Sequence, residues 1–185
     1  NSDPLIVSWP NGIGAEGGVR EQFVHAIDVA PTIYEAVGID PPEEVKGYSQ
    51  SEIEGTSFVY SFDNPDAPER HTTQYFEMIG TRAIYHDGWR AVRPWPFGQR
   101  ITADDLSATS LEDSGWELYN LDEDFSEAND VASEHPEKVL ELAQLWWAEA
   151  GKHDVLPLDG RGVERLAEPR PQPGKAREQY VYHPG

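Results

Sequence analysis

Residues 71–92 read HTTQYFEMIGTRAIYHDGWRAV, and this stretch decides the fold. Residues 73–78 show aromatic and apolar side chains at a period of two, and Gly80 breaks the run. Two similar runs, residues 83–86 and 89–92, are separated by a second glycine. Short alternating runs of aromatic and branched residues between glycines are typical of antiparallel strands. The stretch therefore predicts an antiparallel hairpin or meander.

Two elements downstream are predicted to complete this sheet. Residues 116–120, from the sequence WELYNL, also alternate with a period of two and predict a further strand. Residues 136–150 predict a helix, because Pro136 suits a first turn and Gly151 suits its end. The apolar side chains of this helix share one stripe, so we expect it to pack on the sheet: Val139, Leu142, Ala143, Trp146 and Ala150.

The sequence before residue 71 is different in character. Residues 5–8 lie in a continuous apolar run that is typical of a strand buried in a parallel sheet. Residues 28–37 predict a helix, with Asp28 as its N-cap and Gly38 just beyond its end. A strand, a loop and a helix in this order are α/β in character. Residues 40–55 contain prolines and few large apolar side chains, which predicts a surface loop.

Composition excludes several classes of function. The chain has 185 residues, 34 acidic and 14 basic side chains and a formal net charge of -20, which argues against binding nucleic acid. No apolar run approaches the roughly 20 residues that span a bilayer, so no membrane partner is expected. There is no cysteine, which excludes disulfides. The chain starts with Asn1 and soon enters an apolar run, so we expect its natural start to lie upstream.

The polar residues form no complete catalytic site in the sequence. Six histidines occur without the dense spacing of a metal motif. His25 and Asp28 could bridge a metal ion, or Asp28 could simply cap a helix; His71 could face a pocket or the surface. Residues 122–130 superficially suggest a calcium loop, but they lack the glycine and terminal glutamate of an EF-hand. A solvated acidic surface is the simpler interpretation.

Five segments taken together closely resemble the C-terminal portion of bacterial arylsulfatases. They are PLIVSWPNGI (4–13), QFVHAIDVAPTIYEAVGI (22–39), IEGTSF (53–58), the stretch at 71–92 and WELYNLDEDFSEANDVASEHPEKVLEL (116–142). The resemblance implies an α/β fold in which the end of a sulfatase-type α/β domain precedes a small subdomain, an antiparallel sheet packed against a long helix. The implied boundaries are 1–62 for the α/β end, 63–153 for the subdomain and 154–185 for an extended tail.

The resemblance also implies an activity. Such enzymes hydrolyse sulfate esters to an alcohol or phenol plus sulfate, using a formylglycine nucleophile and a divalent metal, usually calcium. The nucleophile arises from Cys or Ser in a Cys/Ser-x-Pro-Ser-Arg motif, which this sequence lacks. No catalytic or metal-binding residue can therefore be assigned, and this chain alone is expected to be inactive. The expected partners are a small sulfate ester and a missing N-terminal part of the same enzyme.

The resemblance places part of this chain at the rim of the pocket. It implies substrate-binding roles for His71, Arg93 and Trp95, with Thr32 and His25 near the helix start as further candidates. The loop RPWPFGQR at 93–100 could form this rim, or it could cover an edge of the sheet. Two other functions stay open: a non-catalytic truncated module that binds a partner, and a phosphatase or phosphonate hydrolase of the same superfold.

Overall fold

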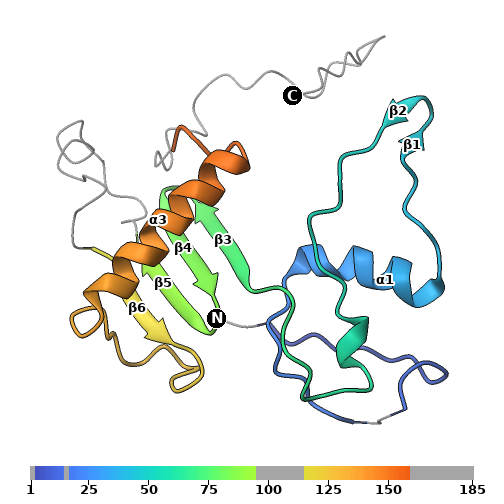
Figure 1. Cartoon of the computed structure of the whole chain (residues 1–185), viewed down its shortest axis with the longest axis horizontal. Helices are drawn as coiled ribbons and strands as arrows, with labels where there is room; N and C mark the ends of the chain where they lie inside the picture. The colour runs from blue at the N-terminus through green and yellow to red at the C-terminus, as the bar shows by residue number, and fades with distance from the viewer. Residues whose placement is uncertain (1–2, 15–16, 95–114, 159–185) are drawn as a thin grey trace.

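A computed structural model describes residues 3–14, 17–94 and 115–158. Its centre is a four-stranded antiparallel sheet in which the strands follow one another in chain order (Figure 1). The strands are β3 (Thr73–Met78), β4 (Thr81–His86), β5 (Trp89–Arg93) and β6 (Glu117–Asn120). The predicted meander is confirmed. The main difference is that β4 begins two residues earlier than the alternation suggested, because Thr81 pairs with Met78 across the turn.

Tight two-residue turns fix the register of the sheet. Ile79 and Gly80 join β3 to β4 with φ values of 51° and 87°, and Asp87 and Gly88 join β4 to β5 with 45° and 77°. Positive φ at both central residues twists the turn in the sense that flanking strands require. A Cβ at Gly88 would also lie only 2.7 Å from an Asp122 carboxylate oxygen. Glycine is therefore favoured at Gly88 by its φ angle, and a larger residue would also displace the Asp122 side chain.

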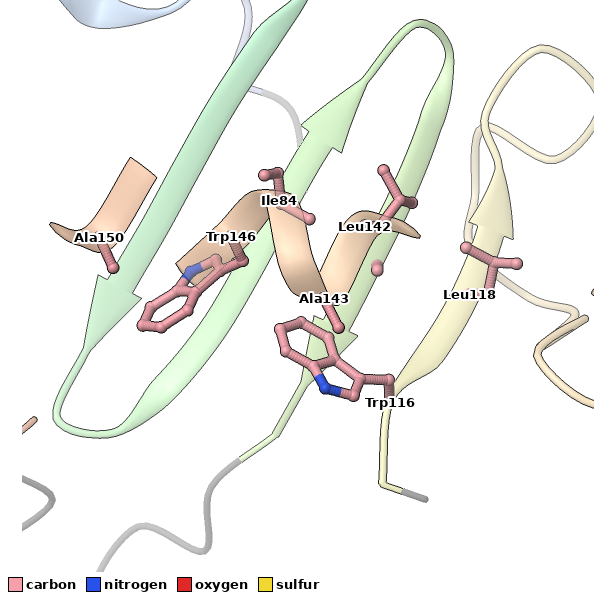
Figure 2. Close-up of a cluster of buried hydrophobic side chains, with 8 residues drawn as sticks. Ile84, Trp116, Leu118, Leu142, Ala143, Trp146 and Ala150 are labelled. Carbon is pink, nitrogen blue, oxygen red and sulfur yellow. The ribbon is translucent and has the colours of Figure 1, made fainter. Parts of the chain in front are cut away.

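Helix α3 (Pro136–Lys152) covers one face of the sheet, as predicted, and ends two residues later than expected. Ile84, Ala91 and Leu118 project from three neighbouring strands toward the helix. Figure 2 shows Leu142 and Trp146 of α3 in the same cluster of buried side chains. The Trp146 indole N–H donates to the Phe76 carbonyl at 3.0 Å, so this large side chain is buried with its polar atom satisfied.

The N-terminal unit, by which we mean the described residues from 3 to 62, lies beside β3, while β6 forms the opposite edge of the sheet (Figure 1). It contains a short 3-10 turn, η1 (Ala26–Asp28), that leads into helix α1 (Val29–Val37). Gly38 ends α1 in the left-handed conformation, with φ 66°, as its place after the helix predicts. A second 3-10 turn is η2 (Val59–Ser61).

The predicted surface loop at 40–55 contains one small ordered element. Strands β1 (Glu44–Val45) and β2 (Tyr48–Ser49) form an exposed hairpin, and the rest of the loop is irregular. Figure 1 shows this hairpin projecting away from the sheet. None of the described helices is long and apolar enough to cross a membrane.

The strand predicted at residues 5–8 is wrong for this structure. These residues are irregular and exposed, and Ile6 is 89% accessible to solvent. A strand needs a hydrogen-bonded neighbour, and within the described part of the chain no strand pairs with this segment. The apolar side chains of residues 5–8 therefore face solvent in this structure.

Candidate functional site

The candidate site is built around the buried carboxylate of Asp28, which is 1% exposed. One of its oxygens accepts the backbone N–H of His25 at 2.7 Å, and the other accepts the N–H of Thr56 at 2.7 Å. The ring Nδ1 of His71 lies 2.7 and 2.8 Å from the two oxygens. Several N–H donors around one carboxylate complement its negative charge. Asp28 occupies the predicted N-cap position of α1, but its side chain makes no capping hydrogen bond to the helix; the carboxylate instead joins three separate segments.

His71 is held from both sides of its ring. Its Nδ1 contacts Asp28, and its Nε2 lies 3.1 Å from the Thr73 carbonyl oxygen, which can only accept a hydrogen bond. The Phe23 ring packs edge-on against the imidazole, with 5.3 Å between ring centroids. The side chain is one-tenth exposed. His71 is therefore an oriented, mostly buried residue at the entrance to β3, which excludes the surface alternative.

Thr32 extends the same hydrogen-bond network into α1. Its buried hydroxyl donates to the Asp28 carbonyl at 2.6 Å and accepts the Phe58 N–H at 3.1 Å. The chain can approach this closely because residue 55 is glycine: a Cβ there would lie 2.1 Å from the Ile27 carbonyl oxygen. Thr32 therefore helps to fasten the segment before η2 onto the start of α1.

His25 lies against the edge strand β3. Its ring centroid is 5.5 Å from that of Phe76 and 6.4 Å from that of His71. Burial, followed by the charge of His71, lowers the pKa of His25, and Asp28 opposes this shift. The structure thus brings together three of the five predicted rim residues: His25, Thr32 and His71.

Arg93 lies elsewhere. It stands four residues along β5 from Trp89, which is level with Thr73 in the sheet. Arg93 is therefore displaced from Thr73 by roughly 13 Å along the strand direction and by two strands across the sheet. There it is buried opposite Arg82. Burial, followed by the charge of Arg93, lowers the pKa of Arg82 to about 10. Trp95 lies outside the described residues.

The sequence reasoning missed the residues that lock the N-terminal unit onto the sheet. Phe23 stacks on Tyr85 with 3.9 Å between ring centroids, and the Tyr85 hydroxyl donates to Glu69 at 2.7 Å. Glu69 also accepts the Phe23 N–H at 3.2 Å. These partners are far apart in the chain, so no local pattern could reveal them. The one available signal was the polar pair His25 and Asp28 at the start of a helix.

The described residues do not fit a metal centre. Among residues 3–14, 17–94 and 115–158, no three His, Cys, Asp or Glu side chains gather so that they could hold an ion. In the acidic loop after β6, Asp124 instead accepts from the Ser126 hydroxyl at 2.7 Å and from the Asn129 N–H at 2.8 Å. These bonds lower the pKa of Asp124. The Asp124 carboxylate therefore stabilises the conformation of the loop in which it lies.

Comparison with known families gives a match over most of the chain. Residues 2–146 match the family described as N-sulphoglucosamine sulphohydrolase, C-terminal. An uncharacterized sulfatase of Schizosaccharomyces pombe is 25% identical over 146 residues, which are 77% of this chain and 24% of the yeast protein. The chain therefore spans about a quarter of the length of this curated relative.

Solved structures match this chain at lower sequence identity, and Ps i-CgsB shows the same fold. The complex of Ps i-CgsB with k-i-k-neocarrahexaose is 19% identical with a TM-score of 0.52, covering 85% of this chain and 31% of that chain. BT4656, solved with its substrate D-glucosamine-2-N,6-O-disulfate, is 20% identical with a TM-score of 0.45, covering 72% of this chain and 25% of that chain.

Proposed function

We propose that this chain, which belongs to the N-sulphoglucosamine sulphohydrolase C-terminal family, is the C-terminal part of a hydrolase that cleaves sulfate esters to an alcohol or phenol plus sulfate. The observation that carries the proposal is the match over residues 2–146, which runs through the N-terminal unit, the sheet and most of α3. The S. pombe relative, itself described as a sulfatase, supports it.

The exposed apolar surface of the N-terminal unit supports the domain division of this proposal. Ile6 and Val7, like Ile33 and Val37 of α1, are large apolar side chains that face solvent. We assign residues 1–62 to the end of the sulfatase α/β domain, residues 63–153 to the sheet and helix subdomain and residues 154–185 to a tail. The rest of the enzyme would cover the apolar surface and restore the neighbours that residues 5–8 lack.

In this proposal the chemistry is divided between two parts of the enzyme. The family's formylglycine supplies the nucleophile, and a divalent metal such as calcium supplies positive charge at the sulfate; both would come from residues outside those described here. The present chain contributes a rigid wall. Asp28 fixes the ring of His71, and Thr32 and His25 hold the adjoining backbone, so this part of the rim is preorganised.

The finer proposal is an aryl ester substrate. Arg93 is the last residue of β5, and Trp95 follows it by two positions in the sequence. An aryl group can stack on an indole, and a guanidinium can attract an anionic ester. These contacts would act on substrate binding rather than on the chemical step.

The experiment that tests the proposal starts from the native protein. An antibody raised against this chain isolates the intact polypeptide from its source, and mass spectrometry gives its length. The isolated protein is assayed for release of sulfate from p-nitrophenyl sulfate and glucosamine N-sulfate, and for release of phosphate from p-nitrophenyl phosphate. We expect a longer polypeptide that carries formylglycine and releases sulfate from the aryl ester.

The other results decide between the alternatives. Release of sulfate from the sugar alone would remove the aryl specificity, and release of phosphate alone would favour a phosphatase. A polypeptide of about the present mass without activity would favour a non-catalytic module. The isolated 185-residue chain is the control: it should give no turnover above background, with or without calcium.

Trp95→Ala in the complete enzyme tests the rim. A lost stacking contact of about 0.5–1.5 kcal/mol should raise KM roughly threefold to tenfold and leave kcat nearly unchanged. Phe125→Ala, at an exposed aromatic residue of the acidic loop, is the matched control and should change neither constant. A lower melting temperature with an unchanged KM would remove Trp95 from the site.

A further inference from the structure

Two histidines connect the N-terminal unit to the sheet and its helix, and both do so through carboxylates. His71 contacts Asp28 at the start of α1, and His153, just after α3, contacts Glu54 at 3.1 Å. We infer that these two contacts form a proton-dependent latch, which holds the N-terminal unit against the sheet when both imidazoles are protonated and loosens when they lose their charge.

His71 lies between two hydrogen-bond acceptors. A carbonyl oxygen lies at its Nε2 and a carboxylate lies at its Nδ1, so each ring nitrogen faces a group that accepts. The carboxylate already takes backbone N–H groups from His25 and Thr56. A neutral imidazole carries one N–H and leaves one lone pair facing an oxygen. Only the imidazolium donates on both sides.

His153 also lies between two acceptors, but it makes ion-pair contacts rather than the hydrogen bonds of His71. Its Nδ1 lies 3.1 Å from Glu54 and its Nε2 lies 3.3 Å from Glu149 of α3. The ring stacks on Tyr75 of β3, with 5.2 Å between centroids, and is 14% exposed. Here too both ring nitrogens face oxygens that only accept, so the protonated ring bridges two carboxylates.

The two contacts are linked through one short segment. Glu54 binds His153, and two residues later the Thr56 N–H binds Asp28, the partner of His71. Gly55, between them, lies so close to η1 that a Cβ would meet the Ile27 carbonyl. Residues 54–56 are therefore held at one end by the Glu54–His153 ion pair and at the other by the hydrogen bond from Thr56 to the carboxylate that His71 contacts.

Other ionisable groups face the latch. His25 faces His71 and has a lowered pKa, so it pulls the pH dependence in the opposite direction. Around His153, Lys152 lies 3.6 Å from Glu149. Burial, followed by the charges of Glu54, Glu149 and Glu77, raises the pKa of Tyr75, which keeps that ring neutral and adds no pH dependence near neutrality.

The direction of the effect follows from linkage. If the latched state holds extra protons, stability falls as pH rises, because the unfolded state then binds fewer protons than the folded state. Histidine side chains change charge between about pH 5 and 8. Exposed carboxyl groups ordinarily titrate near pH 4, so they stay charged throughout this interval.

The test compares melting temperatures of the full 185-residue chain at pH 5.5 and pH 8.5 at fixed ionic strength. His71→Asn and His153→Asn each place an amide where Nδ1 stood, which can donate to the carboxylate at either pH. His135→Asn, at a histidine of the sheet and helix subdomain that does not contact the N-terminal unit, is the matched control. His25 is kept in every variant. Because the charge of His71 lowers the pKa of His25, the contribution of His25 cancels between the wild type and His153→Asn but not where His71 is replaced, so the His153→Asn single variant is the comparison free of it.

We expect the melting temperature of the double variant His71→Asn/His153→Asn to be about 5 °C below that of the wild type at pH 5.5. At pH 8.5 the difference in melting temperature should be less than half as large. The control should follow the wild type. A difference that is equal at both pH values, or larger at pH 8.5, overturns the latch and leaves two ordinary structural histidines.

A second measurement decides the matter if the double variant does not fold. In the wild type, hydrogen exchange compares the Thr56 amide, which binds Asp28, with the Ile84 amide in the sheet core. After correction for intrinsic rates, protection at Thr56 should fall between pH 5.5 and pH 8.5 by about tenfold relative to Ile84. An unchanged ratio contradicts the latch.

Discussion

The sheet with α3 and the N-terminal unit differ in the kind of side chain that is buried most deeply. In the first, Ile84, Leu118, Leu142 and Trp146 are fully buried against one another (Figure 2). In the second, the most deeply buried side chain is a carboxylate, Asp28, while large apolar residues face solvent. We expect the first region to be stabilised mainly by removing its own apolar surface from water. The second buries fewer large apolar side chains, Phe58 and Phe62, and should depend more on hydrogen bonds.

Because of this difference, the two regions depend to different extents on contacts with other parts of a protein. An element that packs its apolar stripe internally can be stable within its own subdomain. A helix such as α1, whose Ile33 is 57% exposed and whose Val37 is 58% exposed, keeps apolar surface available for another part of a protein. We therefore predict four effects of substitutions on the stability of the isolated chain, each measured as a free energy of unfolding in urea.

The largest effect is expected in the sheet core. Trp146→Ala removes a fully buried indole and its bond to the Phe76 carbonyl, so it should cost about 3–5 kcal/mol. Ile33→Ala on α1 should cost less than about 0.5 kcal/mol, because that side chain is mostly in water. Similar losses of unfolding free energy for both variants would mean that α1 is covered in solution. That result would contradict the difference between the two regions.

The next effect concerns the buried carboxylate. Asp28→Asn keeps the shape of the side chain but removes the charge that binds His71 and two backbone N–H groups, so it should cost about 3 kcal/mol. Asp40→Asn, in the exposed loop after α1, should change the free energy by less than about 0.5 kcal/mol. A small loss at Asp28 would show that hydrogen bonds do not dominate the N-terminal unit.

A smaller effect is expected at Thr32. Thr32→Val leaves the buried Phe58 N–H without its acceptor and should cost about 1–3 kcal/mol. Thr32→Ser keeps the hydroxyl and loses only a methyl group, so it should cost clearly less. If serine is as harmful as valine, packing rather than hydrogen bonding explains the role of Thr32.

The smallest effects on the free energy of unfolding are expected at the glycines near the ends of α1 and α3, and they should have opposite signs. Gly38 follows α1 with φ 66°, so Gly38→Ala should cost about 1 kcal/mol. Gly151 lies inside the last turn of α3 and a Cβ there would meet no atom within 4 Å, so Gly151→Ala should stabilise the chain by up to about 1 kcal/mol. Effects of the same sign would contradict the assigned helix ends.

The sheet could be predicted because its information is local. The glycines at 80 and 88 mark both turns, and the alternation between them sets the face of each side chain. Pro136 begins α3 for an equally local reason, since its ring suits a first helical turn. Patterns of two to four residues were enough for these elements.

The candidate site could be predicted only in part. The sequence placed His71 and Thr32 near the right elements, but it gave no indication that Asp28 joins them, because Asp28 and His71 are 43 residues apart. It also grouped Arg93 with His71, although the sheet separates them. For residues 5–8, an apolar run predicted a strand that requires a neighbour, and composition carries no information about neighbours.

The held ring of His71 also affects how β3 meets other molecules. Within the described chain β3 is an edge strand, and such an edge offers free carbonyls to which another chain can add a strand. In an antiparallel pair, every second residue of a strand forms the backbone hydrogen bonds to the neighbouring strand. The two-residue turn after Met78 sets this alternation, so the backbone N–H and C=O groups of Thr73 and Tyr75 point away from β4. Their carbonyls accept from His71 and from the Gln74 amide at 2.7 Å. The side chains therefore occupy the positions at which a foreign strand would begin to pair, which protects the molecule against edge-to-edge aggregation.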